Sequence, residues 1–255
     1  MFKDVEKMQH KSALLLILLL IASSGCILKN NELTLKEGTL TVGVYPYMAP
    51  MTYMKDDELT GYEIEMISEM AKRMDYNVNF KVYEFERLFS ALEYNEIDCA
   101  IAGIGITIDR KTKFEFSRPY RYTFTVITVL KDSSISKIND IEGQKVGVLK
   151  GTLMENKANE LRRTRSFEII KYSSPEIMYS DLNSKKISAA ITDLDSINYN
   201  SQNQNIRVLD EHLDIIYMGI ALKKGNVELL NNINTVMLEM EKDGYFEYLR
   251  DTWIE

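Results

Sequence analysis

Apolar and polar positions in the first half of the chain alternate between strand-like and helix-like periods. The segment 39–44 (TLTVGV) predicts a buried strand, and Val78, Phe80 and Val82 alternate with polar neighbours as in a half-buried strand. A hairpin is expected between these strands at about 51–62. It precedes a helix from about Glu63 to Asp75, whose apolar residues recur at helical spacing: Ile64, Ile67, Met70, Ala71 and Met74. A short helix around 88–92 and an apolar strand at 98–106 follow.

The same alternation begins again after a long β-branched and aromatic strand at 122–130 (YTFTVITVL). Shorter strands at 145–149, 168–172 and 187–192 alternate with predicted helices at about 152–163 and 175–184, the second of which starts at Ser174-Pro175. A last long strand is expected at 216–224 and a last helix at about 227–242. This order predicts an α/β fold on mostly parallel sheet, built as two lobes with a cleft between them.

The N-terminal segment is typical of an export signal. Lysines precede an apolar run from Ala13 to Ala22, which is too short for a permanent membrane helix, and small residues lead directly to Cys26. This ending resembles a lipobox and predicts lipid attachment at Cys26, although Ser23 stands where leucine is common. Plain secretion and an uncleaved anchor are the alternatives. Residues 1–26 are therefore assigned to the signal and 27–37 to a polar tether.

Composition narrows the classes of partner. The 255 residues carry a formal net charge of −7 and the sequence pI is about 5.1, which argues against nucleic acid. If Cys26 is lipidated, Cys99 is the one remaining cysteine, so no internal disulfide is expected. HExxH, G-x-S-x-G, P-loop and cysteine–histidine patterns are absent from the sequence, and no metal site or cofactor is predicted.

Four stretches resemble the family 3 extracellular solute-binding proteins, the polar amino-acid receptors of ABC importers. They are LTGYEIEMISEMAKRM, IDCAIAGIGITIDRKTKFEFSRPY, DIEGQKVGVLKGT and DGYFEYLRDTW, and the second is similar to the family's G-x-T-x-x-R-x-x-x-x-x-F-S-x-P-Y signature. The resemblance implies a type II periplasmic-binding-protein-like fold, in which two crossover strands form a hinge. It places the crossovers near 122–130 and 215–222, lobe one at 38–122 plus 217–255, and lobe two at 123–216.

The resemblance also implies partners and a location. A chain of this family captures a small polar ligand, here expected to be an amino acid, and hands it to an ABC transporter permease. We expect a monomer on the outer face of the cell membrane, held there by lipidated Cys26.

In lobe one, the signature arginine, Arg110, is expected to pair with the α-carboxylate of the ligand, because a guanidinium can give two parallel charge-assisted hydrogen bonds. The alternative is a surface arginine in the basic run 110–113. Backbone groups near Gly103 and Gly105 are expected to complete this half of the site, or else the two glycines only serve a strand end. The family often has serine or threonine where Gly105 stands.

In lobe two, Thr152 and the amide of Leu153 lie at a strand-to-helix turn where an anion can bind, and Thr152 is otherwise a helix cap. Asp193 matches the aspartate that receives the ligand's α-ammonium. It too has the alternative of a helix cap, and Asp195 is a rival for the same role. Arg110 and Asp193 would then clamp a zwitterion from opposite lobes.

Side-chain recognition departs from familiar family members. Phe85 aligns with an aromatic wall that stacks on the ligand, or is a core residue. Tyr45 stands where several members have an acidic residue, and Met48 replaces a frequent aromatic. Arg87 stands where glycine is common. If Arg87 faces the cleft, the ligand carries an extra negative charge.

Two other functions remain open from the sequence. Some cyclohexadienyl dehydratases and lytic transglycosylases share the fold, so fold does not fix function. The one histidine after the signal, His212, lies in a polar stretch, which argues against an enzyme. The other function is a ligand-sensing module that signals to a separate receptor.

Overall fold

The computed structural model describes residues 33–201 and 205–254. The predicted export signal with Cys26, and residues 27–32 of the predicted tether, lie outside the described residues. From Leu33 onward the chain packs as one unit. Within the described part, none of the helices has the length and apolar character needed to cross a membrane.

The first sheet has five strands in the order β5-β1-β6-β13-β7. β1 pairs in parallel with β5 and β6, whereas β13 is antiparallel to β6 and β7. Because β1 lies inside the sheet and is covered on both faces, all its residues after Thr39 are buried. The bounds are β1 (Thr39–Val44), β5 (Asn77–Val82), β6 (Cys99–Ala100), β7 (Phe114–Phe116) and β13 (Ala221–Lys223).

A small hairpin sheet in the order β2-β3-β4 follows β1. Its strands are β2 (Tyr47–Met48), β3 (Thr52–Lys55) and β4 (Glu58–Thr60). Asp56 and Asp57 form the tip between β3 and β4, both with positive φ (50° and 64°), as a two-residue hairpin turn requires. The hairpin predicted from the sequence is therefore confirmed.

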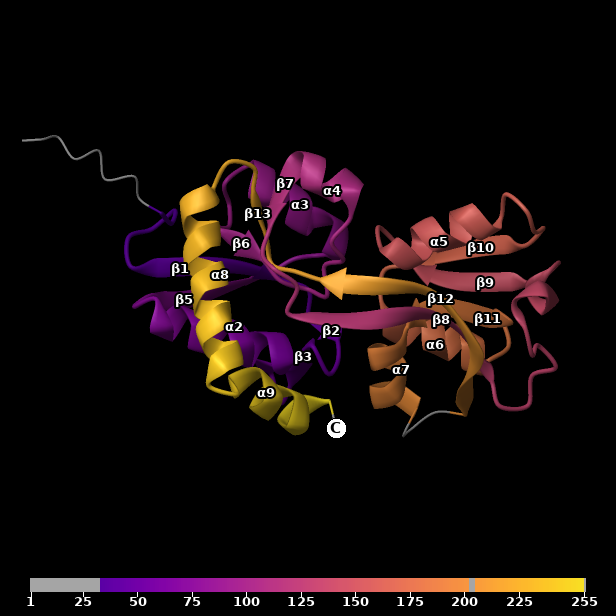
Figure 1. Ribbon diagram of the computed structural model, residues 1–255. Coiled ribbons are helices and arrows are strands. Elements are labelled where there is room, and N and C mark those ends of the chain that lie inside the picture. The colour runs from indigo at the N-terminus through magenta and orange to yellow at the C-terminus, as the bar shows by residue number, and fades with distance from the viewer. Residues whose placement is uncertain (1–32, 202–204, 255) are drawn as a thin grey trace, which may run out of the picture. The chain divides into compact units, whose positions relative to one another are not determined.

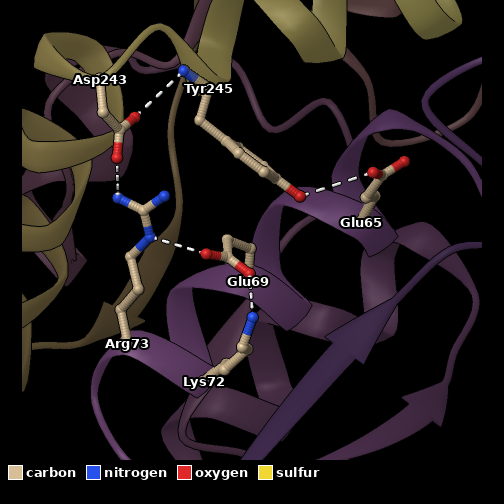
Figure 2. Close-up of polar contacts among 6 residues, drawn as sticks. All are labelled: Glu65, Glu69, Lys72, Arg73, Asp243 and Tyr245. Carbon is tan, nitrogen blue, oxygen red and sulfur yellow. Dashed lines mark hydrogen bonds and ion pairs between the residues drawn. The ribbon is translucent and has the colours of Figure 1, made fainter.

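Helices from both ends of the chain pack with the first sheet: α2 (Tyr62–Arg73), α3 (Phe85–Glu93), α4 (Ile108–Lys113), α8 (Val227–Lys242) and α9 (Tyr245–Trp253). Figure 2 shows how the C-terminal helices dock on α2. Arg73 bonds to Glu69 on its own helix (Nε–Oε1 2.9 Å) and to Asp243 (Nη1–Oδ2 2.6 Å), while the Tyr245 hydroxyl donates to Glu65 at 3.5 Å. The C-terminal segment thus belongs with the first sheet.

The second sheet has the order β10-β9-β11-β8-β12. Its strands are β8 (Arg121–Leu130), β9 (Lys145–Leu149), β10 (Glu168–Tyr172), β11 (Ala189–Asp193) and β12 (Ile206–Met218). Its helices are η1 (Ile138–Ile141), α5 (Leu153–Leu161), α6 (Pro175–Asn183) and α7 (Leu194–Ser201). β9, β10 and β11 are parallel to one another, whereas β8 is antiparallel to β11 and β12.

Two strands connect the sheets (Figure 1). β8 begins soon after β7, and β12 leads into β13. Both β7 and β13 belong to the first sheet. β8 and β12 pair with each other from Arg121–Met218 to Leu130–Ile206. This is the architecture of two α/β lobes with two crossover strands, so the predicted fold class is confirmed. The residues at which each lobe ends stay a prediction.

Two predicted elements differ from the structure. The last long strand begins at Ile206, ten residues earlier than expected, because its polar outer half pairs with β8 along an exposed edge of the sheet. This pairing contains register shifts near His212. The strand expected at 98–106 is regular only at Cys99–Ala100. The strand ends at Ala100, and Gly103 takes a positive φ of 57° in the irregular loop that follows.

An ion pair joins β8 to α7. Arg121 makes a bidentate contact with Asp195 (Nε–Oδ2 2.6 Å, Nη2–Oδ1 2.8 Å), and the two side chains are only 17% and 8% exposed. Truncation of one partner leaves the other charge buried and unpaired, which costs about 3–5 kcal/mol.

We therefore expect Asp195→Ala to lower the free energy of unfolding by about 3 kcal/mol, measured by urea denaturation. The matched control is Asp132→Ala, which removes an exposed pair with Lys185 (2.8 Å) and should cost less than about 1 kcal/mol. Equal losses in the two variants would contradict a stabilising role for the Arg121–Asp195 pair.

Candidate functional site

The loop that follows β6 places main-chain groups at the end of β12. Gly105 forms an isolated bridge with Met218, and the Ile106 amide donates to the Tyr217 carbonyl at 2.7 Å. The Gly103 amide donates to Oε1 of Glu63 at 2.7 Å. The loop is therefore held from two sides. The Gly103 amide is already engaged, and the Ile104 carbonyl accepts from the Gly219 amide at 3.0 Å.

Arg110 lies in α4, the short helix after this loop. The Thr107 side chain caps the helix by accepting from the Arg110 amide at 3.1 Å. The guanidinium donates to the carbonyls of Gly105 (2.9 Å) and Gly151 (3.3 Å). It also lies over the rings of Phe85 and Phe89, 5.7 and 4.8 Å from their centroids.

The guanidinium of Arg110 has no carboxylate partner among residues 33–201 and 205–254. Burial lowers the pKa of Arg110 to about 10, so the side chain is still charged at neutral pH. A partly buried cation held only by carbonyls and aromatic faces is incompletely compensated, and an anion would bind there favourably.

Tyr45 and Phe85 form an aromatic wall beside Arg110. Their rings meet edge to face with centroids 6.1 Å apart, and both side chains are buried. The Tyr45 hydroxyl donates to the Ser173 carbonyl at 2.5 Å, and burial raises the pKa of that hydroxyl. A pocket of about 160 Å³ adjoins this wall and is lined by Tyr45, Met48, Glu84, Phe85, Glu86, Leu149, Lys150, Thr152 and Ser173.

The turn between β9 and α5 forms the opposite side of the pocket. Thr152 is the N-cap of α5, because its hydroxyl oxygen accepts from the Glu155 amide at 3.4 Å, and it donates to the Leu149 carbonyl at 2.7 Å. Gly151 has a φ of +75°. Leu153 packs against Gly105, where a Cβ would lie only 2.4 Å from Leu153 Cδ1. The helix-cap alternative for Thr152 is thus realised, and the residue also lines the pocket.

Asp193 ends β11 and is buried. Its carboxylate accepts from the amide and the hydroxyl of Ser196, at 2.8 and 2.7 Å, so the cap alternative is again realised. Burial raises the pKa of Asp193, against the two bonds from Ser196. No cation pairs with Asp193 in the described part of the chain, whereas Asp195 is neutralised by Arg121. This contrast separates the two rival aspartates.

The structure brings most of the predicted residues together. Tyr45, Phe85 and Thr152 line one pocket, and Arg110 contacts Phe85 and Gly105. Neither Arg110 nor Asp193 is among the residues that line this pocket. Arg87 is also outside the lining, because its guanidinium pairs with Glu96 at 2.5 Å.

Three contacts that the sequence did not reveal hold the two sides of the pocket against each other. These are the Arg110–Gly151 and Tyr45–Ser173 hydrogen bonds and an ion pair between Lys150 and Glu86 at 2.8 Å. Two of them end on main-chain carbonyls, which no residue-type pattern marks. Three or more potential metal ligands do not cluster anywhere in the described part of the chain.

A cleft between two α/β lobes, with a partly buried cation and an aromatic wall, defines a protein that binds a small solute. The family model for bacterial extracellular solute-binding proteins, family 3, matches residues 40–255. The chain belongs to this family, which confirms the prediction from the sequence.

Individual relatives agree with this assignment. The L-cystine-binding protein TcyJ of Escherichia coli (strain K12) is 30% identical over 239 residues, which cover 91% of this chain and 87% of TcyJ. The structure of an ancestral arginine-binding protein bound to arginine has a TM-score of 0.80 at 31% identity. The match covers 86% of this chain and 99% of the ancestral protein's chain. The ancestral amino acid-binding protein AncCDT-1, a precursor of cyclohexadienyl dehydratase, has a TM-score of 0.81 at 28% identity, over 86% and 96% of the two chains.

Gly151 gives a test of how the two sides meet. A Cβ at Gly151 would lie 2.3 Å from Glu86 Cγ, whereas one at Gly225, which also has a positive φ (+89°), would meet nothing within 4 Å. Both alanine variants should lose about 1–2 kcal/mol of stability from backbone strain.

Only Gly151→Ala should displace Glu86 and separate the two sides. Small-angle X-ray scattering should therefore give a larger radius of gyration for Gly151→Ala than for the wild-type protein or for Gly225→Ala. Identical scattering from all three proteins would show that Gly151 does not matter for closure.

Proposed function

We propose that this protein captures an amino acid between its two lobes and delivers it to the permease of an ABC importer. The observation that carries the proposal is a pair of opposite charges with no counterion in the described residues: the partly buried Arg110 of α4 and the buried Asp193 at the end of β11. A buried charge without a partner lowers stability, so an unpaired cation and an unpaired anion are favoured only if a ligand compensates them.

An amino-acid zwitterion supplies both missing partners. Its α-carboxylate can replace the Gly105 and Gly151 carbonyls as acceptor for the Arg110 guanidinium, since a carboxylate is the stronger acceptor. Its α-ammonium can pair with Asp193. Because the two charges come from different lobes, the ligand favours the closed arrangement by contacting both.

The aromatic wall is proposed to receive the ligand's side chain. Tyr45, Phe85 and Met48 give an apolar surface, and Glu84, Glu86 and Lys150 place charges of both signs in the same pocket. Relatives that bind cystine and arginine are compatible with a polar or charged side chain at this point.

The remaining roles follow from the family. We propose a monomer on the outer face of the cell membrane, with lipid attachment through Cys26 as the anchor. Catalysis is the second candidate, because AncCDT-1 is a precursor of a dehydratase. Turnover of prephenate or arogenate by the pure protein would favour catalysis. In its absence, binding is the function.

A thermal-shift screen of the twenty amino acids should identify a ligand, because binding to the folded state alone adds about 2.7 kcal/mol at a hundredfold excess over Kd. Arg110→Ala should then weaken that ligand by about 100-fold or more, and Asp193→Asn by about 10- to 100-fold, as expected for lost charged hydrogen bonds. Asparagine keeps an acceptor for Ser196, so α7 should remain capped.

Arg87→Ala is the matched control, since Arg87 is exposed and its guanidinium already pairs with the carboxylate of Glu96. Titration calorimetry should give this variant the Kd and ligand preference of the wild-type protein. Loss of binding in Arg87→Ala but not in Arg110→Ala would reverse the assignment.

The pH dependence of binding follows from Asp193. Burial raises the pKa of its carboxyl above the ordinary value, and only the ionised form pairs with an ammonium. Kd should therefore be constant near neutral pH and rise about tenfold per pH unit once the pH falls below this raised pKa. Calorimetry across a pH series measures the slope, and Asp193→Asn should lack it. The same slope in Asp193→Asn would place the titrating group elsewhere.

A further inference from the structure

Glu63 is a buried carboxylate at a junction of four chain segments. It lies in the first turn of α2, and its side chain is inaccessible to solvent. Oε2 accepts from the Thr52 hydroxyl of β3 at 2.6 Å. Oε1 accepts from the Gly103 amide at 2.7 Å and from the Tyr120 hydroxyl through a short hydrogen bond.

The hydrogen-bond partners of the Glu63 carboxyl are all neutral. Burial raises the pKa of the Glu63 carboxyl, whereas the bonds from Thr52, Tyr120 and Gly103 lower it. No cationic side chain bonds to it in the described residues, and the N-terminus of α2 gives a favourable field. A stabilised core alone does not require such a group, because an apolar residue would fill the same volume without a desolvation cost.

The partners of Oε1 connect the site to both crossover strands. Gly103 begins the loop whose next glycine, Gly105, gives its carbonyl to Arg110. Tyr120 directly precedes β8, and its amide donates to the Met218 carbonyl at the end of β12 (3.1 Å). One carboxylate oxygen therefore fixes the Arg110 loop relative to the points where β8 and β12 enter the first lobe.

We propose that Glu63 is a positioning residue of the ligand site, which holds the 103–105 loop and the start of β8 in the geometry that presents Arg110 to the ligand. The proposal rests on the proposed function of the cleft, because its effect is read through ligand affinity. The length of the side chain and its acceptor oxygen, not its charge, are the properties that matter.

Three substitutions in the full chain separate these properties. Glu63→Gln keeps the length and one acceptor oxygen for Gly103 and Tyr120, and its amide can donate to Thr52. Glu63→Asp keeps the charge but is one methylene too short to reach the loop. Thr52→Val, the matched control, removes the bond to β3 and leaves the bonds from Gly103 and Tyr120 intact.

Ligand affinity is measured by calorimetry well below each unfolding midpoint, with the amino acid found in the screen. Glu63→Asp should raise Kd by about tenfold or more, whereas Glu63→Gln and Thr52→Val should stay within about threefold of the wild-type value. A merely structural role would lower the unfolding midpoint and leave Kd unchanged in every variant. Wild-type Kd in folded Glu63→Asp, or weaker binding in Glu63→Gln than in Glu63→Asp, would overturn the proposal.

A second measurement does not depend on the folding of any variant. Amide hydrogen exchange of the wild-type protein should be slow at Gly103 even without ligand, since this amide is bonded to a buried carboxylate. Fast exchange at Gly103 would overturn the positioning role. If the wild-type protein binds none of the twenty amino acids, the proposed function itself is wrong. Slow exchange at Gly103 would in that case show that Glu63 has a structural role only.

Discussion

The arrangement of the cleft depends on a constraint of electrostatics: charges removed from water need a partner. Arg110 is held by two carbonyls and two aromatic rings, and Asp193 by the donors of one serine. Neither group meets an opposite charge in the described part of the chain, although the nearby Asp195 does. Under the proposed function, these two unpaired groups of opposite charge bind the two charged ends of one ligand.

The two lobes are joined by a pair of strands. β8 and β12 pair side by side over their whole length, so the connection between the lobes is a two-stranded ribbon and not a single flexible segment. Contacts such as Tyr45–Ser173 and Lys150–Glu86 join the lobes at the pocket. They are few and partly exposed, so a ligand that bonds to both lobes can compete with them and shift the equilibrium between open and closed arrangements.

The sequence predicted those features of the fold and site that depend on local hydrophobic patterns or on one specific motif. Hydrophobic period located β1 and α2, and the hairpin expected at about 51–62 is present. The signature around Arg110 predicts the lobe-one half of the site. The polar outer half of β12 was missed, because its pairing with β8 and not its own pattern makes it a strand. The choice between Asp193 and Asp195 was also beyond the sequence, since it depends on Arg121, 74 residues away from Asp195.

Glu63 looks like an ordinary acid in the first turn of a helix. Its burial depends on Thr52, Gly103 and Tyr120 from three other segments.

The most direct test of the zwitterion clamp changes the ligand and leaves the protein intact. Calorimetry would compare the amino acid with its α-methyl ester, which lacks the carboxylate charge, and with its deaminated analogue, which lacks the ammonium. If Arg110 and Asp193 each pair with one end of the ligand, both analogues should bind about 100-fold more weakly or worse. An analogue that binds as tightly as the parent amino acid would show that the charge it lacks is not recognised, and would contradict the clamp.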